Sequence, residues 1–346
     1  MSEERQGEPA EGAAVRDAAR HATSVDASSV HASSVHASSV HATIHPASVH
    51  AASVRHQGVW EAVADLVHQR RSDLGRPLRV LDLGGGTGGL AVPLAELGHE
   101  ITVVDPSPNA LATLERRAAE FGVADRITAR QGDADSLADL RSGHGTPAAG
   151  YGTSGTARGW LDGTITATHT TTATESSTAT ADTAGIGDTA EAHTRYDLVC
   201  CHGVLEVVDD PAKALTGIAS VLAPAGHLSL LVAGRLAVVL AKALAGELVQ
   251  AKEALTSVDG RWGRSDPLPR RFDLAELTIL LEQSGLRPQQ IHGVRIFTDL
   301  VPSSAFDSST DRAALADLER AVATHPHYAD TLGNLGAGLH AIAQRT

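Results

Sequence analysis

Short apolar runs recur along the chain at intervals typical of the strands of a sheet. The first of them, RVLDL, ends at a row of glycines. Runs of this length that are bounded by turn residues are typical of buried strands. They predict five strands, at residues 79–83, 100–104, 126–130, 196–201 and 228–232.

Segments with helical apolar spacing lie between these runs. They predict helices at residues 60–70, 90–97, 109–121, 212–222 and 274–283. Strands that alternate with helices predict a doubly wound α/β fold, with a mostly parallel sheet and helices on both faces. Ligands bind such sheets at the carboxyl ends of the strands, so the loops after the strands are the expected site.

Two segments have a composition that does not support folding. Residues 1–53 contain the repeat SSVHA, which places His31, His36 and His41 five residues apart. This period fits neither a helix nor a strand and predicts a disordered extension, while a metal-binding histidine tract is the alternative. Residues 141–194 are rich in Thr, Ala, Gly and Ser, and they predict a disordered insertion within one domain that spans residues 54–346.

Composition narrows the functional class. Hydrophobic residues make up 42% of the chain and aromatic residues 3%, so the core is expected to consist of Ala, Val and Leu.

No apolar run is long enough to span a membrane, and the acidic start MSEERQGEPAEG is unlike a secretory signal. The adjacent Cys200 and Cys201 cannot form an ordinary disulfide with each other, which favours a cytoplasmic protein. A net charge of −13 argues against strong nonspecific binding to nucleic acid.

The glycine run after the first strand fits two cofactor templates. Gly84, Gly86 and Gly89 match the G-x-G-x-x-G pattern of dinucleotide enzymes, and Gly84, Gly86 and Gly88 match the G-x-G-x-G pattern of methyltransferases. Glycines in this place allow the backbone to approach a ligand closely, although a tight turn alone also requires them. The neighbouring residues must therefore identify the cofactor.

The carboxylates near the glycine run favour S-adenosyl-L-methionine, with Asp82 and the pair Asp133 and Asp135 as the discriminating positions. Asp105 ends the second strand, where it can accept the hydroxyl protons of a ribose in either cofactor. Asp82 precedes the first glycine by two residues, where it can bind the cationic amino-acid end of S-adenosylmethionine but would repel a pyrophosphate. Asp133 and Asp135, in the phrase GDAD, can read an adenine, and the alternative is that they are solvated loop acids.

Two residues are candidates for catalysis. His202 follows the fourth strand, and it can act as a general base for an amine or phenol acceptor or can be a structural histidine. Arg295, in GVRIFTD on an expected late strand, can pair with a carboxylate or phosphate, or can form a surface salt bridge with Asp299.

The remaining charged groups add two expectations. Four arginines flank a loop around Trp262, where they can close over the cleft, touch a nucleic-acid backbone or be ordinary solvated charge: Arg261, Arg264, Arg270 and Arg271. The sequence shows no metal-ligand pattern at the expected cleft, so no metal is expected there.

Taken together, the phrases VLDLGGGTGG, VVDPS, GDAD, YDLVCCHGVLEVVDDP and LAPAGHLSLLV stand in the order found in class I S-adenosylmethionine-dependent methyltransferases. The chain resembles this family, which implies a Rossmann-like seven-stranded sheet with the strand order 3-2-1-4-5-7-6. More narrowly, HGVLEVVDDP, LAGELVQA, GVRIFTDL and LGAGLHAIAQ resemble the tRNA 5-carboxymethoxyuridine methyltransferases, which esterify a carboxylate on a wobble uridine. The resemblance implies cofactor contacts from Arg55, Gly84, Gly85, Asp105, Ala134, Asp135 and His202; Asp82, Gly86 and Asp133 join them on the reasoning above.

The acceptor stays open between a modified tRNA nucleoside and a small molecule. Ala233-Gly234-Arg235-Leu236 replaces a Tyr-Asn stretch of the narrower family, and Ala337-Gly338 replaces an Arg-Tyr pair. Two other classes compete with a methyltransferase. An NAD(P)-dependent oxidoreductase would carry an apolar residue in place of Asp82, and a non-catalytic nucleotide-binding module would keep the cofactor half alone.

Overall fold

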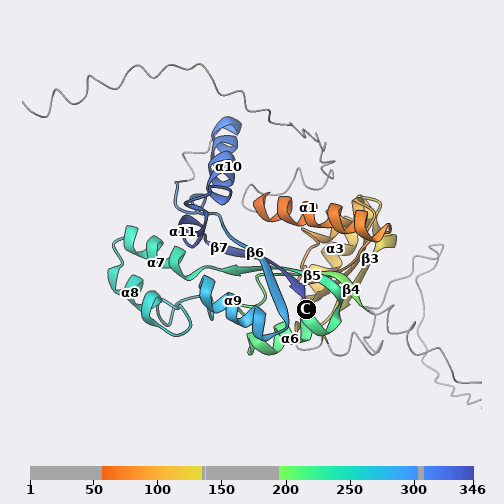
Figure 1. Ribbon diagram of the computed structural model, residues 1–346, viewed down its shortest axis with the longest axis horizontal. Coiled ribbons are helices and arrows are strands. Elements are labelled where there is room, and N and C mark those ends of the chain that lie inside the picture. The colour runs from red at the N-terminus through yellow and green to blue at the C-terminus, as the bar shows by residue number, and fades with distance from the viewer. Residues whose placement is uncertain (1–56, 135–136, 138–194, 303–307) are drawn as a thin grey trace, which may run out of the picture. The chain divides into compact units, whose positions relative to one another are not determined.

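A computed structural model describes residues 57–134, 137, 195–302 and 308–346 of the chain (Figure 1). Its centre is a seven-stranded sheet with the order β3-β2-β1-β4-β5-β7-β6, which confirms the expected order. The strands are β1 (Arg79–Leu83), β2 (Glu100–Asp105), β3 (Ile127–Gln131), β4 (Tyr196–His202), β5 (Leu222–Ala233), β6 (Leu286–Val294) and β7 (Gly338–Arg345). Strands β1 to β5 pair in parallel, and β7 is antiparallel to both β5 and β6. The carboxyl end of β6 therefore lies at the same edge of the sheet as those of β1 to β5.

Helices cover both faces of the sheet, as expected for a doubly wound fold. One face packs against α1 (Gln57–Leu74), α2 (Ala91–Glu96) and α3 (Pro108–Glu120), and the other against α6 (Pro211–Val221) and α9 (Leu274–Gln283). Capping side chains mark where three of these helices begin, α3, α6 and α9. Ser107, Asp210 and Asp273 each accept a hydrogen bond from the backbone N–H three residues further on.

Alternating residues of the central strands supply two separate cores. Val80 and Cys200 pack on the α1 side, whereas Leu81 and Cys201 pack on the α6 side. All four side chains are fully buried. Adjacent residues of a strand point to opposite faces, so the two neighbouring thiols belong to different layers.

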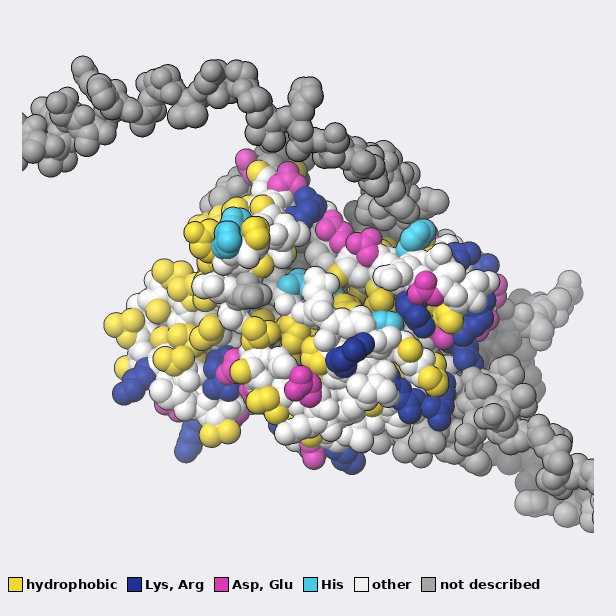
Figure 2. Space-filling view, viewed as in Figure 1, with side chains coloured by type: hydrophobic (Ala, Val, Ile, Leu, Met, Phe, Trp, Pro, Cys, Tyr) yellow, Lys and Arg dark blue, Asp and Glu magenta, His cyan; other side chains and the backbone are white. Residues whose placement is uncertain are grey.

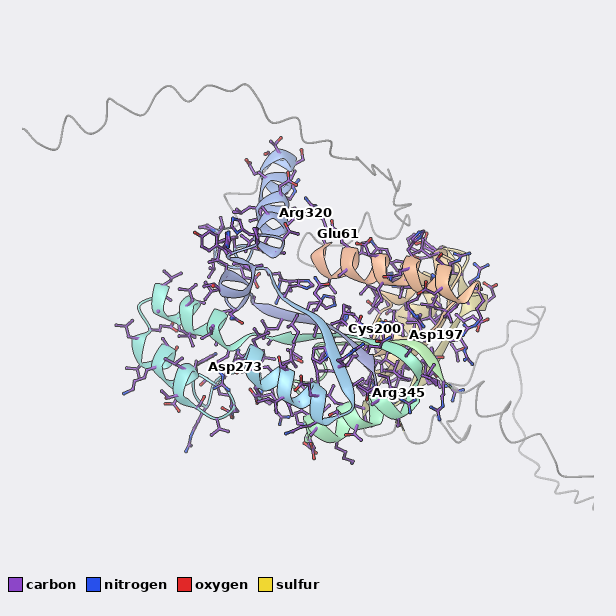
Figure 3. The ribbon with its side chains drawn as sticks, viewed as in Figure 1. Glu61, Asp197, Cys200, Asp273, Arg320 and Arg345 are labelled. Atoms are coloured by element: carbon purple, nitrogen blue, oxygen red, sulfur yellow. The ribbon has the colours of Figure 1, made fainter. Side chains whose placement is uncertain are left out.

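The structure adds helices outside the two layers. They are the short 3₁₀ helix η3 (Ala124–Arg126), α7 (Arg235–Leu244), α8 (Leu248–Thr256), α10 (Ser309–Ala323) and α11 (Ala329–Gly333). Helices α7 and α8 pack on each other and extend from the carboxyl end of β5, with Leu244, Leu248 and Val249 exposed on their surface (Figures 1 and 2). Helix α10 is tied to α1 by Arg320, whose guanidinium donates to Glu61 at 3.3 Å (Figure 3). None of the helices in the described ranges is long and apolar enough to cross a membrane.

Two elements differ from the sequence-based expectation. Strand β5 begins at Leu222, because Leu222 pairs with Tyr196 before the register shifts at the next residues of β4. Ala225, in the bulged part of β5, has a φ of 55°. Arg295 was expected on a strand but lies just after β6, with a left-handed φ of 58°.

The arginine-rich loop before α9 also differs in part. Arg271 is buried and forms two hydrogen bonds with Asp266, at 2.6 and 3.0 Å. This ion pair holds the pKa of Asp266 below its usual range, although burial opposes the effect. Arg271 is therefore a structural residue inside the loop and not the solvated or ligand-facing charge expected from the sequence.

Candidate functional site

The glycine loop between β1 and α2 depends on backbone conformations that favour glycine. Gly84, Gly86 and Gly88 have φ values of 71°, 54° and 78°. The N–H of Gly84 donates to the Val104 carbonyl at 2.7 Å, which joins the loop to the end of β2. A Cβ on Gly85 would lie 2.5 Å from an oxygen of Asp82. The loop therefore brings bare backbone to the carboxyl edge of the sheet.

We expect Gly84→Ala to destabilise the protein by at least about 1–2 kcal/mol, the cost of a left-handed residue with a side chain. A Cβ there would also lie 2.3 Å from Cγ2 of Val204, which forms part of the loop after β4. Thermal unfolding measures the effect, and Gly89→Ala is the matched control because a Cβ on Gly89 would have no atom within 4 Å. Equal melting temperatures for the two variants would contradict this account of the loop.

Asp105, at the end of β2, holds the loop with its side chain. One carboxylate oxygen accepts the Gly86 N–H at 2.9 Å, and the other accepts the Ser107 N–H at 2.8 Å. The residue is 8% exposed. Each carboxylate oxygen has further lone pairs, so the fixed carboxylate can also accept two hydroxyl protons.

Asp82 is a buried carboxylate beneath the same loop. It is 3% exposed, and its Oδ2 has no hydrogen-bond partner among the described residues. Burial, followed by the nearby charge of Asp105, raises the pKa of Asp82 to about 7. An unpartnered buried carboxylate is costly, and a cationic ligand would remove that cost.

The remaining expected cofactor residues are only partly within the described chain. Asp133 is exposed and Ala134 is buried in the loop after β3, and the Gly132 N–H joins this loop to the Asp105 carbonyl at 3.3 Å. Arg55 and Asp135 lie outside the described residues. The structure thus brings Asp82, Gly84 to Gly86, Asp105 and Ala134 to one edge of the sheet.

His202 ends β4 at this edge. Its Nε2 lies 2.9 Å from Oγ of Ser229 on β5, and the same hydroxyl lies 2.8 Å from Nε2 of His340 on β7. Nδ1 of His340 lies 3.4 Å from Nε2 of His292 on β6. This row was not predicted from the sequence, because no spacing rule connects residues that lie on four different strands.

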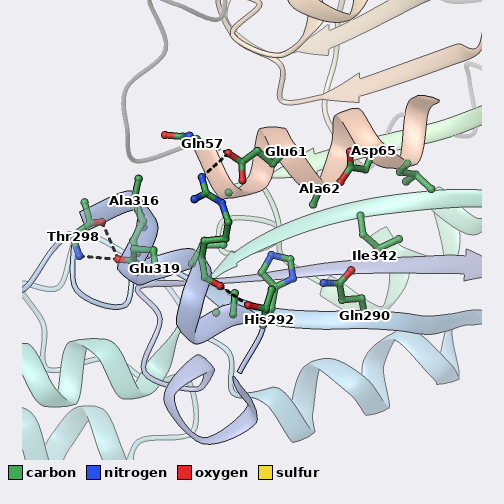
Figure 4. A pocket seen from close by; sticks show the side chains of 18 of the residues that line it. Gln57, Glu61, Ala62, Asp65, Gln290, His292, Thr298, Ala316, Glu319 and Ile342 are labelled. Carbon is green, nitrogen blue, oxygen red and sulfur yellow. Dashed lines mark hydrogen bonds and ion pairs between the residues drawn. The ribbon is translucent and has the colours of Figure 1, made fainter. Parts of the chain in front are cut away.

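A cavity of about 520 Å³ lies between α1, β6, β7 and α10 (Figure 4). His292 and Ile342 form part of its wall from the sheet, and Figure 4 shows the imidazole of His292 directed toward α1. Glu61 and Asp65 line it from α1, and Glu319 lines it from α10. The described part of the chain contains no group of three or more His, Cys, Asp or Glu residues placed to hold a metal ion.

Arg295 lines the same cavity near the carboxyl edge. Its Nε lies 3.6 Å from Oδ2 of Asp299, and its side chain is 28% exposed. The ion pair anticipated from the sequence is therefore present. The terminal guanidinium nitrogens remain candidates for an acidic group of a ligand.

Comparison with known proteins adds to this geometry. A family model described as a methyltransferase domain matches residues 54–291. The tRNA 5-carboxymethoxyuridine methyltransferase of Escherichia coli K12 is 26% identical over 222 residues, 64% of each protein. The ubiquinone biosynthesis O-methyltransferase of Azorhizobium caulinodans is 45% identical over 62 residues, 18% of this chain and 24% of that enzyme. The chain thus spans less than two thirds of the length of either relative.

Solved structures also resemble the chain. Magnesium protoporphyrin IX methyltransferase from Synechocystis PCC 6803, with bound SAH, has a TM-score of 0.45 and 15% identity. The match covers 85% of this chain and 86% of that one.

Proposed function

Because the chain belongs to the methyltransferase-domain family, we propose that it transfers the methyl group of S-adenosyl-L-methionine to an acceptor at the carboxyl edge of its sheet. The observation that carries this proposal is the buried, unpartnered carboxylate oxygen of Asp82. The ammonium group of the cofactor's amino-acid end supplies the cation that this oxygen lacks. The phosphate-bearing NAD(P) would instead place negative charge near the same group.

The other cofactor contacts follow from the same edge. The backbone of Gly84, Gly85 and Gly86 approaches the cofactor, and Asp105 accepts the ribose hydroxyls. Asp133, Ala134 and Asp135 bind the adenine after β3. By resemblance to the family, Arg55 and His202 complete the cofactor contacts.

Methyl transfer from a sulfonium is an in-line displacement in which the cofactor carries the activated methyl group. The residues of this chain can contribute largely by aligning the acceptor, which supplies up to about 7–11 kcal/mol in well-oriented reactions. We assign this role to His202 because it ends β4, and because Val204 in the loop after β4 lies close to Gly84. The first candidate acceptor is a small molecule.

A carboxylate on a modified tRNA nucleoside is the second candidate acceptor. The 26% identical relative with that name and the cavity-lining Arg295 favour it. Three strand spacings separate β4 from β6, which is about 14 Å at the usual spacing. Arg295 would therefore bind an acidic group of the acceptor at some distance from His202.

We expect Arg295→Lys to lower transfer to such an acidic acceptor strongly and to leave cofactor binding intact. Lysine keeps the charge but loses the planar fork that binds a carboxylate or phosphate through two hydrogen bonds. Steady-state kinetics on total tRNA would measure the change. Equal turnover by the wild type and the lysine variant would show that Arg295 only forms its ion pair with Asp299. Such exposed ion pairs contribute only about 0–1 kcal/mol.

Two measurements test the proposed function. Calorimetry compares S-adenosylhomocysteine with NAD, and tighter binding of NAD would contradict the proposal. Transfer of a tritiated methyl group into total tRNA and, separately, into a metabolite extract then distinguishes the two acceptor classes.

A further inference from the structure

The histidines at the candidate site form one row across four adjacent strands. His202 pairs in register with Leu231 of β5, Leu231 pairs with His340 of β7, and His340 pairs with His292 of β6. Residues paired in this way point to the same face of a sheet. Ser229 lies two residues before Leu231 and shares that face, which is the face covered by α1.

Hydrogen bonds join the row into a continuous chain. Ser229 is fully buried and bridges His202 and His340, at 2.9 and 2.8 Å. His340 is also fully buried and meets His292 at 3.4 Å, the longest of the three contacts. The chain runs from the carboxyl edge at β4 to the cavity wall at β6.

Burial favours the neutral form of the inner imidazoles. The pKa of His340 is held well below its usual value by burial and by the neighbouring His202 and His292. Burial also lowers the pKa of His292. A neutral imidazole donates from one ring nitrogen and accepts at the other, which is what a chain that passes a proton requires.

We propose that His202, Ser229, His340 and His292 form a proton relay that removes the proton released when a hydroxyl or N–H acceptor is methylated, and delivers it to the cavity beside α1. The inference rests on the proposed function, because it requires a methyl donor beside His202. It assigns the acceptor to the class of oxygen or nitrogen nucleophiles that lose a proton. A carboxylate is already ionised near neutral pH and would need no such path.

The protons balance along the chain. As the acceptor oxygen or nitrogen bonds to the methyl carbon, the carbon–sulfur bond breaks and the acceptor proton passes to Nδ1 of His202. His202 gives its Nε2 proton to Oγ of Ser229, whose own proton passes to Nε2 of His340. The Nδ1 proton of His340 then passes to Nε2 of His292, and His292 loses its Nδ1 proton to water in the cavity.

His292 ends the row at the wall of the cavity. Its Nδ1 is buried and has no hydrogen-bond partner among the described residues. The ring must therefore turn toward the cavity that it lines before this nitrogen can meet water. The charged and titratable groups that line the cavity or contact its ring are Glu61 and Asp65 of α1, Glu319 and Arg320 of α10, Arg295 after β6, and His340 of β7.

Both of these arginines already have acidic partners. Arg320 pairs with Glu61 and Asp317, and Arg295 pairs with Asp299. The two arginines therefore add no uncompensated positive charge to the cavity wall.

Histidine ¹⁵N NMR of the full chain tests the relay without a known acceptor. In the wild type, the ring nitrogens of His292 should show a titration step at the midpoint of His202, because protons rearrange along the whole row. Ser229→Ala should abolish this shared step, and Ser229→Thr, which keeps the hydroxyl, should retain it. The control Ser284→Ala removes a buried serine hydroxyl outside the row and should leave the step unchanged. A His292 signal with no component at the His202 midpoint would overturn the relay.

His292→Gln is a second variant that leaves the buried Ser229 and His340 in place. It should shift the titration midpoint of His202, whereas an unlinked histidine would leave that midpoint unchanged and overturn the proposal. This variant keeps the test valid if Ser229→Ala fails to fold.

Kinetics with two probe acceptors separate the relay from the proposed function. Catechol offers a hydroxyl and 5-carboxymethoxyuridine offers a carboxylate. We expect methylation of catechol, with a kcat lowered about 10²-fold in Ser229→Ala, the lower end of a general base's contribution. In the same variant, the pH–rate profile should lose the fall in rate at low pH that marks protonation of the base. Methylation of the carboxylate alone, at equal rates in both proteins, would overturn the relay, whereas failure to bind S-adenosylhomocysteine would overturn the proposed function.

Discussion

Asp105→Ala is expected to weaken the binding of S-adenosylhomocysteine by about 10- to 100-fold, because hydrogen bonds to a charged partner contribute about 1.5–3 kcal/mol. The side chain has two roles that the variant removes together. It is proposed to accept the ribose hydroxyls, and it already holds the Gly86 and Ser107 N–H groups. Calorimetry at neutral pH measures the affinity directly.

Asp125→Ala is the matched control for this loss. Asp125 is an exposed aspartate in η3, away from the carboxyl edge of β2. Its replacement should leave affinity unchanged within about twofold. An Asp105 variant that bound equally well would remove the ribose assignment and leave Asp105 as a residue that only shapes the glycine loop.

Asp82→Asn is expected to stabilise the cofactor-free protein at pH 8 and to weaken cofactor binding at the same pH. The pKa of Asp82 rises from its usual 3.8 to about 7, first because of burial and then because of Asp105. Between these two values the folded state binds more protons than the unfolded state, so the free energy of unfolding falls as pH rises through this window. The ionised carboxylate then costs roughly 4 kcal/mol above pH 7.

Two pH values separate the contributions to this effect. At pH 3, below both the unfolded and the folded pKa of Asp82, the Asn variant and the wild type should melt at similar temperatures. At pH 8 the variant should melt several degrees higher but bind S-adenosylhomocysteine at least about tenfold more weakly, because it lacks the carboxylate proposed for the ammonium group. A variant that melted lower at pH 8 and kept full affinity would contradict both assignments.

The sequence predicted the part of the fold in which local pattern and tertiary burial agree. The run RVLDL became β1 over the same residues, and the helix expected at residues 274–283 has those bounds in the structure. Asp82, the glycines and Asp105 were predicted because a buried strand, a glycine turn and a terminal carboxylate lie next to one another in the chain. These candidates meet at one edge because parallel strands end on the same side.

Features that depend on residues far apart in sequence were not predicted. The row from His202 to His292 needs the register of β4, β5, β7 and β6, and no single strand reveals it. Arg271 was grouped with solvated arginines because its partner Asp266 is recognised only once the loop folds back on itself. Arg295 was placed on a strand because its apolar neighbours continue the strand pattern, whereas its left-handed backbone ends β6 one residue earlier.

Because the two thiols face opposite helical layers, the reactivity of each thiol reports how often one face of the sheet becomes exposed. Burial raises the pKa of both Cys200 and Cys201, so the reactive thiolate is scarce in the closed state. A thiol reagent can then modify each cysteine only during excursions that expose the layer above it. A form with one cysteine replaced reports the transient detachment of the α1 side alone or of the α6 side alone. The modification rates of the two adjacent cysteines thus measure local unfolding on the two faces of the sheet independently.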